Sequence, residues 1–171
     1  MNEIWVQALG FVGFAINLCA VSSVDDRRVR ACICLSCLTF ATHYALMGAI
    51  VASANLLINS FRALVSLKYS GKKVFWVFVV VQLVLSAALY SEPKDLLPMM
   101  ASLISCYALF CAKGMTMRFT FLTCNVFWLL NSIVNGSYGG VVNDLFNNTI
   151  LCITIFRLHR RNKLQQAATQ A

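Results

Sequence analysis

Long apolar segments separated by gaps of only a few residues dominate this sequence. An α-helix needs about 17–25 apolar residues to cross a lipid bilayer, and most of the segments have this length. They cover residues 4–24, 31–49, 50–69, 74–90, 96–112, 119–136 and 139–158. The pattern predicts an all-α membrane protein with seven transmembrane helices.

Basic residues are concentrated in every second gap between these segments, as is typical of short loops that stay in the cytoplasm. The basic gaps are 25–30, 72–73, 113–118 and 157–163, whereas the gaps on the other side hold only Lys94. This asymmetry predicts an N-terminus outside and a C-terminus in the cytoplasm. It also explains the net charge of +8 without nucleic acid, and it makes anionic lipid headgroups the expected partners of the loops.

The composition leaves little room for chemistry outside the bilayer. Hydrophobic residues make up 60% of the 171 residues and charged residues only 12%. There are two histidines, no carboxylate pair within a segment and no glycine-rich phosphate loop, so we expect neither an enzyme nor a cofactor. The cysteines Cys32, Cys34 and Cys37 cluster without a neighbouring histidine, which favours packing over a metal site.

The two halves of the chain coincide when one is shifted by 88 residues. The positions that then match are rare polar residues, turn glycines and loop charges: Arg30 with Arg118, Gly48 with Gly136, Asn55 with Asn143 and Asn59 with Asn147. The match predicts two three-helix units joined by a linker helix, a 3+1+3 arrangement. The predicted parts are repeat 1 (1–73), a linker helix (74–90), repeat 2 (91–163) and a disordered cytoplasmic tail (164–171).

One linker helix between the units gives both units the same orientation in the membrane. This plan resembles that of the SWEET-type sugar transporters and the nicotinamide riboside permeases. The resemblance implies a substrate site near the membrane midplane, at the interface between the repeats.

At the level of sequence the chain resembles the YgjV-type bacterial inner-membrane proteins over nearly its whole length. The residues that carry the likeness are Leu96-Leu97-Pro98, Ser105, Ala108-Leu109-Phe110, Lys113 to Arg118, His43, Gly48, Asn59, Arg62 and Ile155-Phe156-Arg157. The resemblance implies a location in the bacterial inner membrane. It supplies no functional residues.

Asparagines within the third and seventh segments are the first candidates for a site. Asn55 and Asn59 lie four residues apart and so share one helix face, and Asn143 and Asn147 repeat this spacing. Amides at this depth either hold helices together or line a cavity that contains water. The two pairs occupy matching positions in the repeats, and Asp144 lies next to one of them. The sequence therefore supports a cavity and a purely structural role about equally.

The sixth segment adds a polar face with an indole in it. Asn125, Trp128, Asn131 and Asn135 recur at helical spacing. Amides beside an aromatic plane suit a neutral polar solute such as a riboside or a sugar-like molecule. The predicted substrate-binding residues are Asn55, Asn59, Trp128, Asn131, Asn143 and Asn147.

Three ionisable residues within the segments have alternative roles. His43 and Asp144 are candidates for proton coupling; alternatively, His43 satisfies a backbone carbonyl and Asp144 is hydrated near the interface. For Arg62 we expect the long side chain to extend to the inner headgroups rather than to bind a buried anion.

These observations give a leading hypothesis and two alternatives. The leading one is a carrier for a small neutral polar solute, with Asn59 and Asn147 as the central pair. The second is a non-transporting receptor or regulatory membrane protein whose asparagines are structural. A third is a lipid- or cation-handling protein centred on Asp144. Since both repeats lie in one chain, a monomer could form a complete pathway, and the sequence leaves the oligomeric state open.

Overall fold

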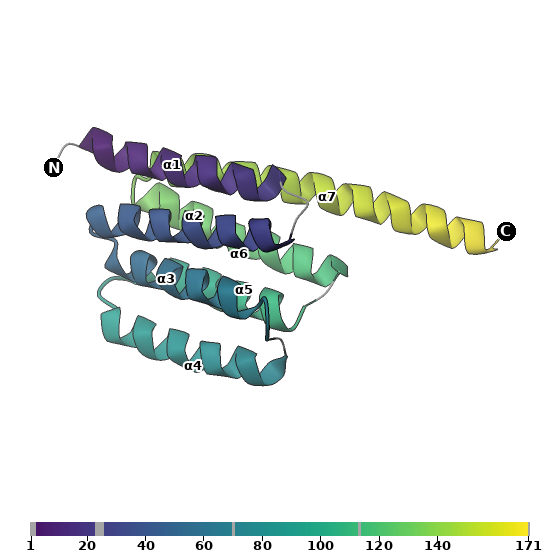
Figure 1. The fold of residues 1–171 in the computed structure, drawn as a ribbon, viewed down its shortest axis with the longest axis horizontal. Helices are drawn as coiled ribbons and strands as arrows, with labels where there is room; N and C mark the ends of the chain where they lie inside the picture. The colour runs from purple at the N-terminus through teal and green to yellow at the C-terminus, as the bar shows by residue number, and fades with distance from the viewer. Residues whose placement is uncertain (1–2, 23–25, 70, 113, 171) are drawn as a thin grey trace.

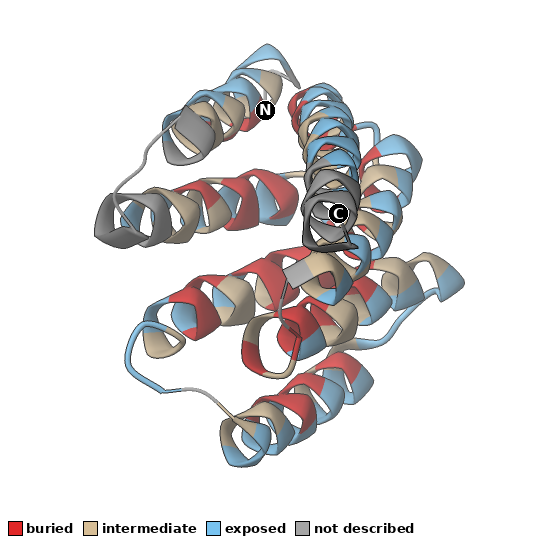
Figure 2. Cartoon of the chain, turned by 90° about the vertical axis from the view of Figure 1, so that its right-hand side faces the viewer, coloured by how far each residue is buried: buried red, intermediate tan, exposed pale blue. Residues whose placement is uncertain are grey.

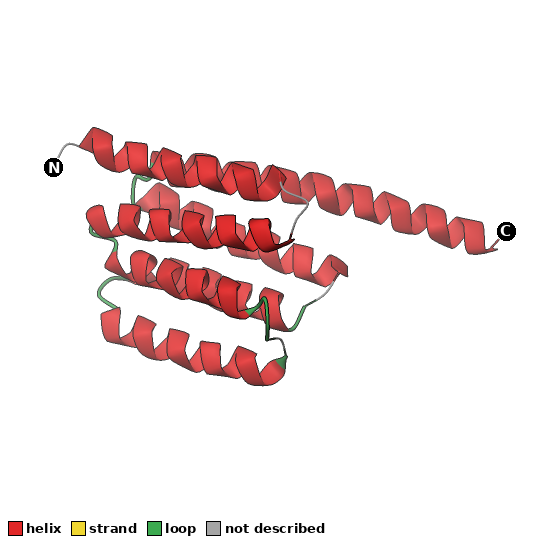
Figure 3. Ribbon diagram, in the orientation of Figure 1, coloured by secondary structure: helices red, strands yellow, loops and turns green. Residues whose placement is uncertain are grey.

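The computed structural model describes residues 3–22, 26–69, 71–112 and 114–170, and these ranges contain helices and no strands (Figures 1 and 3). Seven α-helices and one short 3-10 helix follow one another along the chain. Their bounds are α1 (Glu3–Ser22), α2 (Asp26–Leu46), α3 (Ile50–Val65), α4 (Lys72–Leu89), η1 (Pro93–Asp95), α5 (Leu96–Phe110), α6 (Gly114–Val134) and α7 (Tyr138–Gln170).

Six of the helices form a ring. Following the contacts around it, α1 packs on α2, α2 on α3, α3 on α5, α5 on α6, α6 on α7, and α7 on α1. Helix α4 stands outside the ring, against α3 and α5. In Figure 1 it is the lowest helix, whereas α1 and the start of α7 lie at the top. The N-terminal and C-terminal ends lie at opposite ends of the bundle.

The bundle is apolar on the outside and holds many polar side chains in its interior, beside two hydrophobic clusters, whereas a soluble protein keeps most polar side chains on its surface. Helix α4 shows this well: Trp76, Val80 and Val84 are exposed, whereas Gln82 and Ser86 are buried. Viewed along the helices in Figure 2, the buried residues face the centre and the exposed ones point outward. An extensive apolar exterior of this kind is suited to contact with lipid.

Among the described residues, length and composition alone identify two helices that could cross a membrane. They are α4 and the Met115–Val134 part of α6. Helices α1, α2 and α3 contain the shorter apolar stretches Ile4–Cys19, Ala31–Leu46 and Ile50–Val65. These three stretches are too short to count as spans by this criterion.

The two turns that follow α2 and α6 have the same backbone geometry. Gly48 has φ of +80° and Gly136 has φ of +66°, a region that glycine enters without steric cost. In each turn the glycine N–H donates three residues back, and the next N–H donates five residues back, from Ala49 to Tyr44 and from Ser137 to Ser132. This is the Schellman motif that ends many helices.

Most predicted boundaries lie close to the observed helix ends, and four do not. Helix α2 begins at Asp26 rather than at 31, and α6 begins at Gly114 rather than at 119, because both helices include the charged residues before their apolar segments. Helix α3 ends at Val65, although its apolar segment continues to 69, because the chain makes a turn before α4. The tail predicted to be disordered from 164 is helical to Gln170 and extends beyond the bundle (Figure 1). Its alanine, glutamine and leucine residues favour a helix, so that α7 continues to Gln170. In the predicted basic gaps, Asp25 and Lys113 lie outside the described residues.

Candidate functional site: a polar cavity inside the helix ring

A cavity of about 140 Å³ lies inside the ring. Side chains from α1, α2, α3, α6 and α7 form its wall, and amides, hydroxyls and aromatic rings predominate in it. The lining residues are Asn17, Ile33, Ser36, Cys37, Phe40, Tyr44, Leu56, Asn59, Asn125, Trp128, Gly140, Asn143, Asp144 and Asn147.

Four of the six predicted substrate-binding residues lie in this wall: Asn59, Trp128, Asn143 and Asn147. On the α7 side, the Asn17 amide donates to Oδ1 of Asn143 at 2.9 Å and to Oδ1 of Asn147 at 3.0 Å. Asn17 thus fixes the orientation of both α7 amides. Sequence reasoning missed it, although a lone asparagine in an apolar segment was a signal for an inward-facing position.

Asn59 connects the cavity to a second polar cluster, which lies between α3, α4 and α5. Its Oδ1 accepts a hydrogen bond from Arg62 and another from the Ser102 hydroxyl. The Ser102 hydroxyl also lies 2.7 Å from Oε1 of Gln82 on α4. A change at Asn59 therefore affects both the cavity and the contact between these three helices.

Asn55 belongs to that second cluster and is not part of the cavity wall. It is fully buried, its amide donates to the Val51 carbonyl at 2.7 Å, and its Oδ1 accepts from Gln82. Gln82 also donates to Ser86 at 3.0 Å. Asn55 therefore joins α3 to the linker helix, which corresponds to the structural role that the sequence left open.

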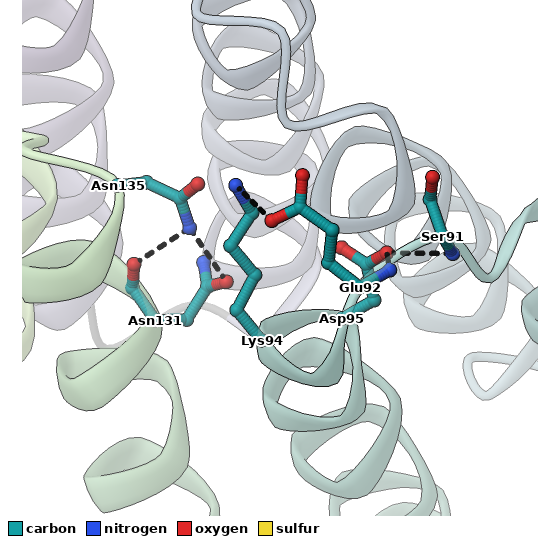
Figure 4. A network of polar contacts seen from close by, with 6 residues as sticks. All are labelled: Ser91, Glu92, Lys94, Asp95, Asn131 and Asn135. Carbon is teal, nitrogen blue, oxygen red and sulfur yellow. Dashed lines mark hydrogen bonds and ion pairs between the residues drawn. The ribbon is translucent and has the colours of Figure 1, made fainter.

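Asn131 also lies outside the cavity wall, near the end of α6. Its side-chain and main-chain oxygens accept from the Asn135 amide at 3.0 and 2.8 Å (Figure 4). Of the predicted polar face on this helix, Asn125 and Trp128 point into the cavity, whereas Asn131 and Asn135 bond to each other. The polar face of α6 is longer than the cavity, so the residues near the end of the helix lie outside the cavity wall.

Arg62 is buried, and the expectation that it extends to the headgroups is wrong. Only 1% of its surface is exposed. The guanidinium donates to the Ser102 carbonyl at 2.9 Å, to the Ser105 hydroxyl at 2.6 Å and to Asn59. These acceptors from two helices hold the guanidinium inside the bundle. If the side chain extended to the headgroups instead, the acceptors would be left buried and unpaired.

Asp144 lies in the cavity wall and is 7% exposed. Its carboxyl oxygens accept from the Ser132 hydroxyl at 2.7 Å and from the Asn143 amide at 3.1 Å. Tyr44 lies beside this group, with its hydroxyl 2.8 Å from that of Ser132. Asp144 is therefore buried in the cavity wall, and not hydrated near the interface as in the alternative that the sequence left open.

His43 lies on α2, one residue before Tyr44, and is fully buried. Its Nδ1 is 2.8 Å from the Val6 carbonyl and its Nε2 is 2.7 Å from the Ser137 hydroxyl. The carbonyl contact matches the structural alternative for this residue. The second contact leads toward α7 and the cavity.

A larger hollow of about 460 Å³ opens at the end of the bundle where α2 and α6 finish. We call this hollow the vestibule. It is lined by Val6, Gln7, Leu46, Met47, Asn135, Gly136 and Tyr138.

The loop between α4 and α5 lies at the same end, where Lys94 pairs with Glu92 at 2.9 Å (Figure 4). The Glu92 carboxylate raises the pKa of the Lys94 ammonium by accepting its hydrogen bond.

The cysteines have packing roles in the described part of the chain. Cys34 Sγ lies 2.9 Å from the Ser60 hydroxyl, and Cys124 donates to the Ala101 carbonyl at 3.2 Å. No group of three or more His, Cys, Asp or Glu side chains that could hold a metal ion occurs among the described residues.

Comparison with known proteins identifies the family of the chain. Residues 4–162 match the family model described as a bacterial inner membrane protein, Imp-YgjV. Over 165 residues the chain is 28% identical to the inner membrane protein YgjV of Escherichia coli (strain K12), which covers 94% of this chain and 90% of that protein. No solved structure matches the chain. With an apolar exterior, a polar interior and this match, the chain belongs to the YgjV family of bacterial inner membrane proteins.

Proposed function

We propose that the protein is a carrier for a small neutral polar solute, and that the central cavity is its binding site. One observation carries the proposal: Asn59 and Asn147, which the 88-residue shift relates to each other, both line this cavity. Equivalent residues that meet in one cavity between two repeats are typical of carriers that alternate access by rocking one unit against the other.

The arrangement of the helices supports two three-helix units joined by α4. If α1 to α3 correspond to α5 to α7, the contact of α3 with α5 is equivalent to the contact of α7 with α1. The turns at Gly48 and Gly136 repeat the same hydrogen bonds 88 residues apart. These two observations favour units related by a pseudo-twofold axis, with the cavity close to it.

The size of the cavity narrows the class of solute. A cavity of about 150 Å³ holds a molecule of the size of benzene, and this one has about 140 Å³. A riboside or a hexose is larger than this volume. We therefore propose a smaller solute than the sequence indicated, such as a short polyol or a small amide.

The chemistry of the wall favours a neutral molecule. Amides of Asn17, Asn59 and Asn147 offer both donors and acceptors, and the Trp128 ring offers an apolar surface. Arg62, the buried cation nearest to this wall, already donates to groups on α3 and α5. An anionic solute would therefore lack a free partner of opposite sign on the α3 side.

A receptor or regulatory role with structural asparagines is the second candidate, and the contacts of two residues favour it. Asn55 bonds to Gln82 and to the Val51 carbonyl, and the Asn131 oxygens accept from Asn135, so both side chains hold positions outside the cavity wall. In this alternative the remaining amides would also serve only to hold helices together, as Asn17 does for Asn143 and Asn147.

Thermal unfolding of the purified protein in detergent, with and without small neutral polyols and amides, separates the two candidates. A ligand that binds only the native state stabilises it by about 2.7 kcal/mol at 100 times its Kd. For a carrier, the unfolding temperature rises with solute concentration, and Asn147→Ala removes this rise.

The matched control is Asn131→Ala, which removes an amide outside the cavity wall. It should lower the unfolding temperature and retain the full response to solute. If no solute raises the unfolding temperature, and Asn147→Ala and Asn131→Ala both act only by lowering it, the structural candidate replaces the carrier.

A further inference from the structure

A row of hydroxyl groups connects His43 on α2 to Asp144 on α7. The Ser137 hydroxyl lies 2.7 Å from Nε2 of His43. At the other end, the Ser132 hydroxyl donates to Oδ2 of Asp144 at 2.7 Å and lies 2.8 Å from the Tyr44 hydroxyl. The Tyr44, Ser132 and Ser137 hydroxyls all surround Gly140, which places the two parts of the row side by side.

Gly140 provides the space in which these hydroxyls meet. A Cβ atom at this position would lie 2.6 Å from the Ser137 hydroxyl, 2.7 Å from the Ser132 hydroxyl and 2.8 Å from the Tyr44 hydroxyl. Three oxygens from three helix segments thus converge on one glycine. Any side chain at 140 would push them apart, so the row depends on the absence of one.

The proton positions on His43 follow from its partners. The Val6 carbonyl can only accept, so Nδ1 carries a hydrogen and donates to it. Nε2 is then free to accept from Ser137 when the ring is neutral, or to donate to Ser137 when the ring is doubly protonated. His43 can therefore deliver or receive a proton through Nε2 alone, without losing its contact with α1.

The two ends of the row face different spaces. Asp144 lines the central cavity. Ser137 lies between Gly136 and Tyr138, which both line the vestibule, and Val6, the partner of His43, lines it too. The row thus crosses the layer of side chains that separates the vestibule from the cavity.

We propose that the hydroxyls of Ser137, Tyr44 and Ser132 form a relay that transfers a proton between His43 and Asp144, which makes the proton the ion coupled to solute binding. In the transfer, Nε2 of His43 gives its proton to Ser137. Ser137 passes its own proton to Tyr44, Tyr44 to Ser132, and Ser132 to Oδ2 of Asp144. The imidazolium becomes neutral, the carboxylate becomes a carboxylic acid, and each hydroxyl ends with one proton.

Ser132 has one more acceptor within reach, the Trp128 carbonyl at 3.0 Å. When Asp144 is protonated and donates to Ser132, the Ser132 proton can turn to that carbonyl or to Tyr44. The hydroxyl therefore keeps a partner in either direction of transfer. A relay needs this property, because each member must both give and accept.

Few other titratable groups face the relay from the described parts of the helices around it. Asp144 faces Tyr44 and Cys37 from α2 and Cys124 from α6, and α1 and α3 present the amides of Asn17 and Asn59. His43 faces the α1 backbone at Val6 and Gly10, and Ser137 of α7. The Arg62 guanidinium donates to Ser102, Ser105 and Asn59, none of which belongs to the row.

Infrared difference spectroscopy between acid and alkaline pH tests the relay in protein reconstituted into vesicles of anionic phospholipid, with no solute present. The carboxylic-acid band that Asp144→Asn removes belongs to Asp144. His43→Gln should move the pH midpoint of this band upward by roughly one unit, because the positive charge of the protonated ring favours the carboxylate. In a Tyr44→Phe variant, which lacks the central hydroxyl, the band should appear roughly tenfold more slowly after a rapid drop in pH, because the row no longer carries a proton to Asp144.

Tyr107→Phe, which removes the hydroxyl of a half-exposed tyrosine on α5, is the control in which the band should appear at the parent rate. If Tyr44→Phe does not fold, Ser137→Ala interrupts the row at the next member. The relay is overturned if Asp144 shows no such band, if His43→Gln has no effect, or if the band appears at the same rate with and without Tyr44. The coupling to a solute rests on the proposed function, but this measurement contains no solute, so the relay and the carrier can fail separately.

Discussion

At the scale of the residue, the amides inside the bundle divide into two groups by what they contact. Asn59, Asn143 and Asn147 line the cavity, whereas Asn55 and Asn131 are paired with neighbouring amides outside it. Depth and spacing are similar in both groups, so only the packing of neighbouring helices separates them. Arg62 belongs with the second group, because its three acceptors lie on α3 and α5.

The buried guanidinium gives the first prediction. Arg62→Lys should lower the free energy of unfolding by about 1–3 kcal/mol, because an ammonium cannot reach the Ser102 carbonyl, Ser105 and Asn59 in one planar geometry, and an acceptor is left unpaired. Thermal unfolding in detergent measures the change. The control is Lys68→Arg on the exposed end of the same segment, and equal effects of the two substitutions would contradict the buried role.

Cavity residues that recur in both halves of the chain could be predicted from the sequence. Residues without a matching residue in the other half could not. Asn59 and Asn147 could be predicted because rare polar residues coincide at one shift. Asn17 corresponds to Ser105 under the same shift, so no matching amide marked it. Gln82 lies in the linker helix, which has no counterpart. The contacts of Arg62 depend on the packing of α3 against α5, which local sequence does not encode.

At the scale of the element, close helix contacts determine where the cavity lies. Helices α1 and α7 meet at Gly10 and Gly139, where a Cβ at 139 would lie 2.7 Å from the backbone nitrogen of Phe11. Backbones approach this closely only where side chains are absent. The contact brings Asn17 within reach of Asn143 and Asn147.

This contact gives the second prediction. Gly139→Ala should destabilise the protein by about 1–3 kcal/mol or more, because the added methyl group overlaps the α1 backbone and forces α1 and α7 apart. Val142→Ala, on the exposed face of the same helix, should have a much smaller effect. Unfolding temperatures in detergent compare the two. A Gly139→Ala protein as stable as the parent would mean that α1 and α7 do not approach so closely.

At the scale of the whole molecule, the basic gaps predict the direction of insertion. The ends of the chain lie at opposite ends of the bundle, as an odd number of antiparallel helices requires. Short basic loops are retained in the cytoplasm, so we expect the end that carries Lys72, Lys73 and Arg118 to face inward.

Reporter fusions test this third prediction. A fluorescent protein fused after Ala171 should be fluorescent, and a periplasmic phosphatase fused there should be inactive, because the C-terminus is predicted to be cytoplasmic. A phosphatase inserted after Glu92 should be active. The reverse result at both sites would show the opposite orientation, and would exchange the sides on which the vestibule and the basic loops lie.

Exchange of a labelled solute across vesicles that contain the purified protein tests the carrier most directly. The solutes are neutral polyols and amides of up to about six non-hydrogen atoms, the size of benzene, which a cavity of this volume holds. We predict exchange that is faster than in empty vesicles, that saturates with concentration and that Asn147→Ala abolishes while Asn131→Ala retains it. Flux no greater than in empty vesicles, for every solute of this class and from correctly folded protein, would contradict the account.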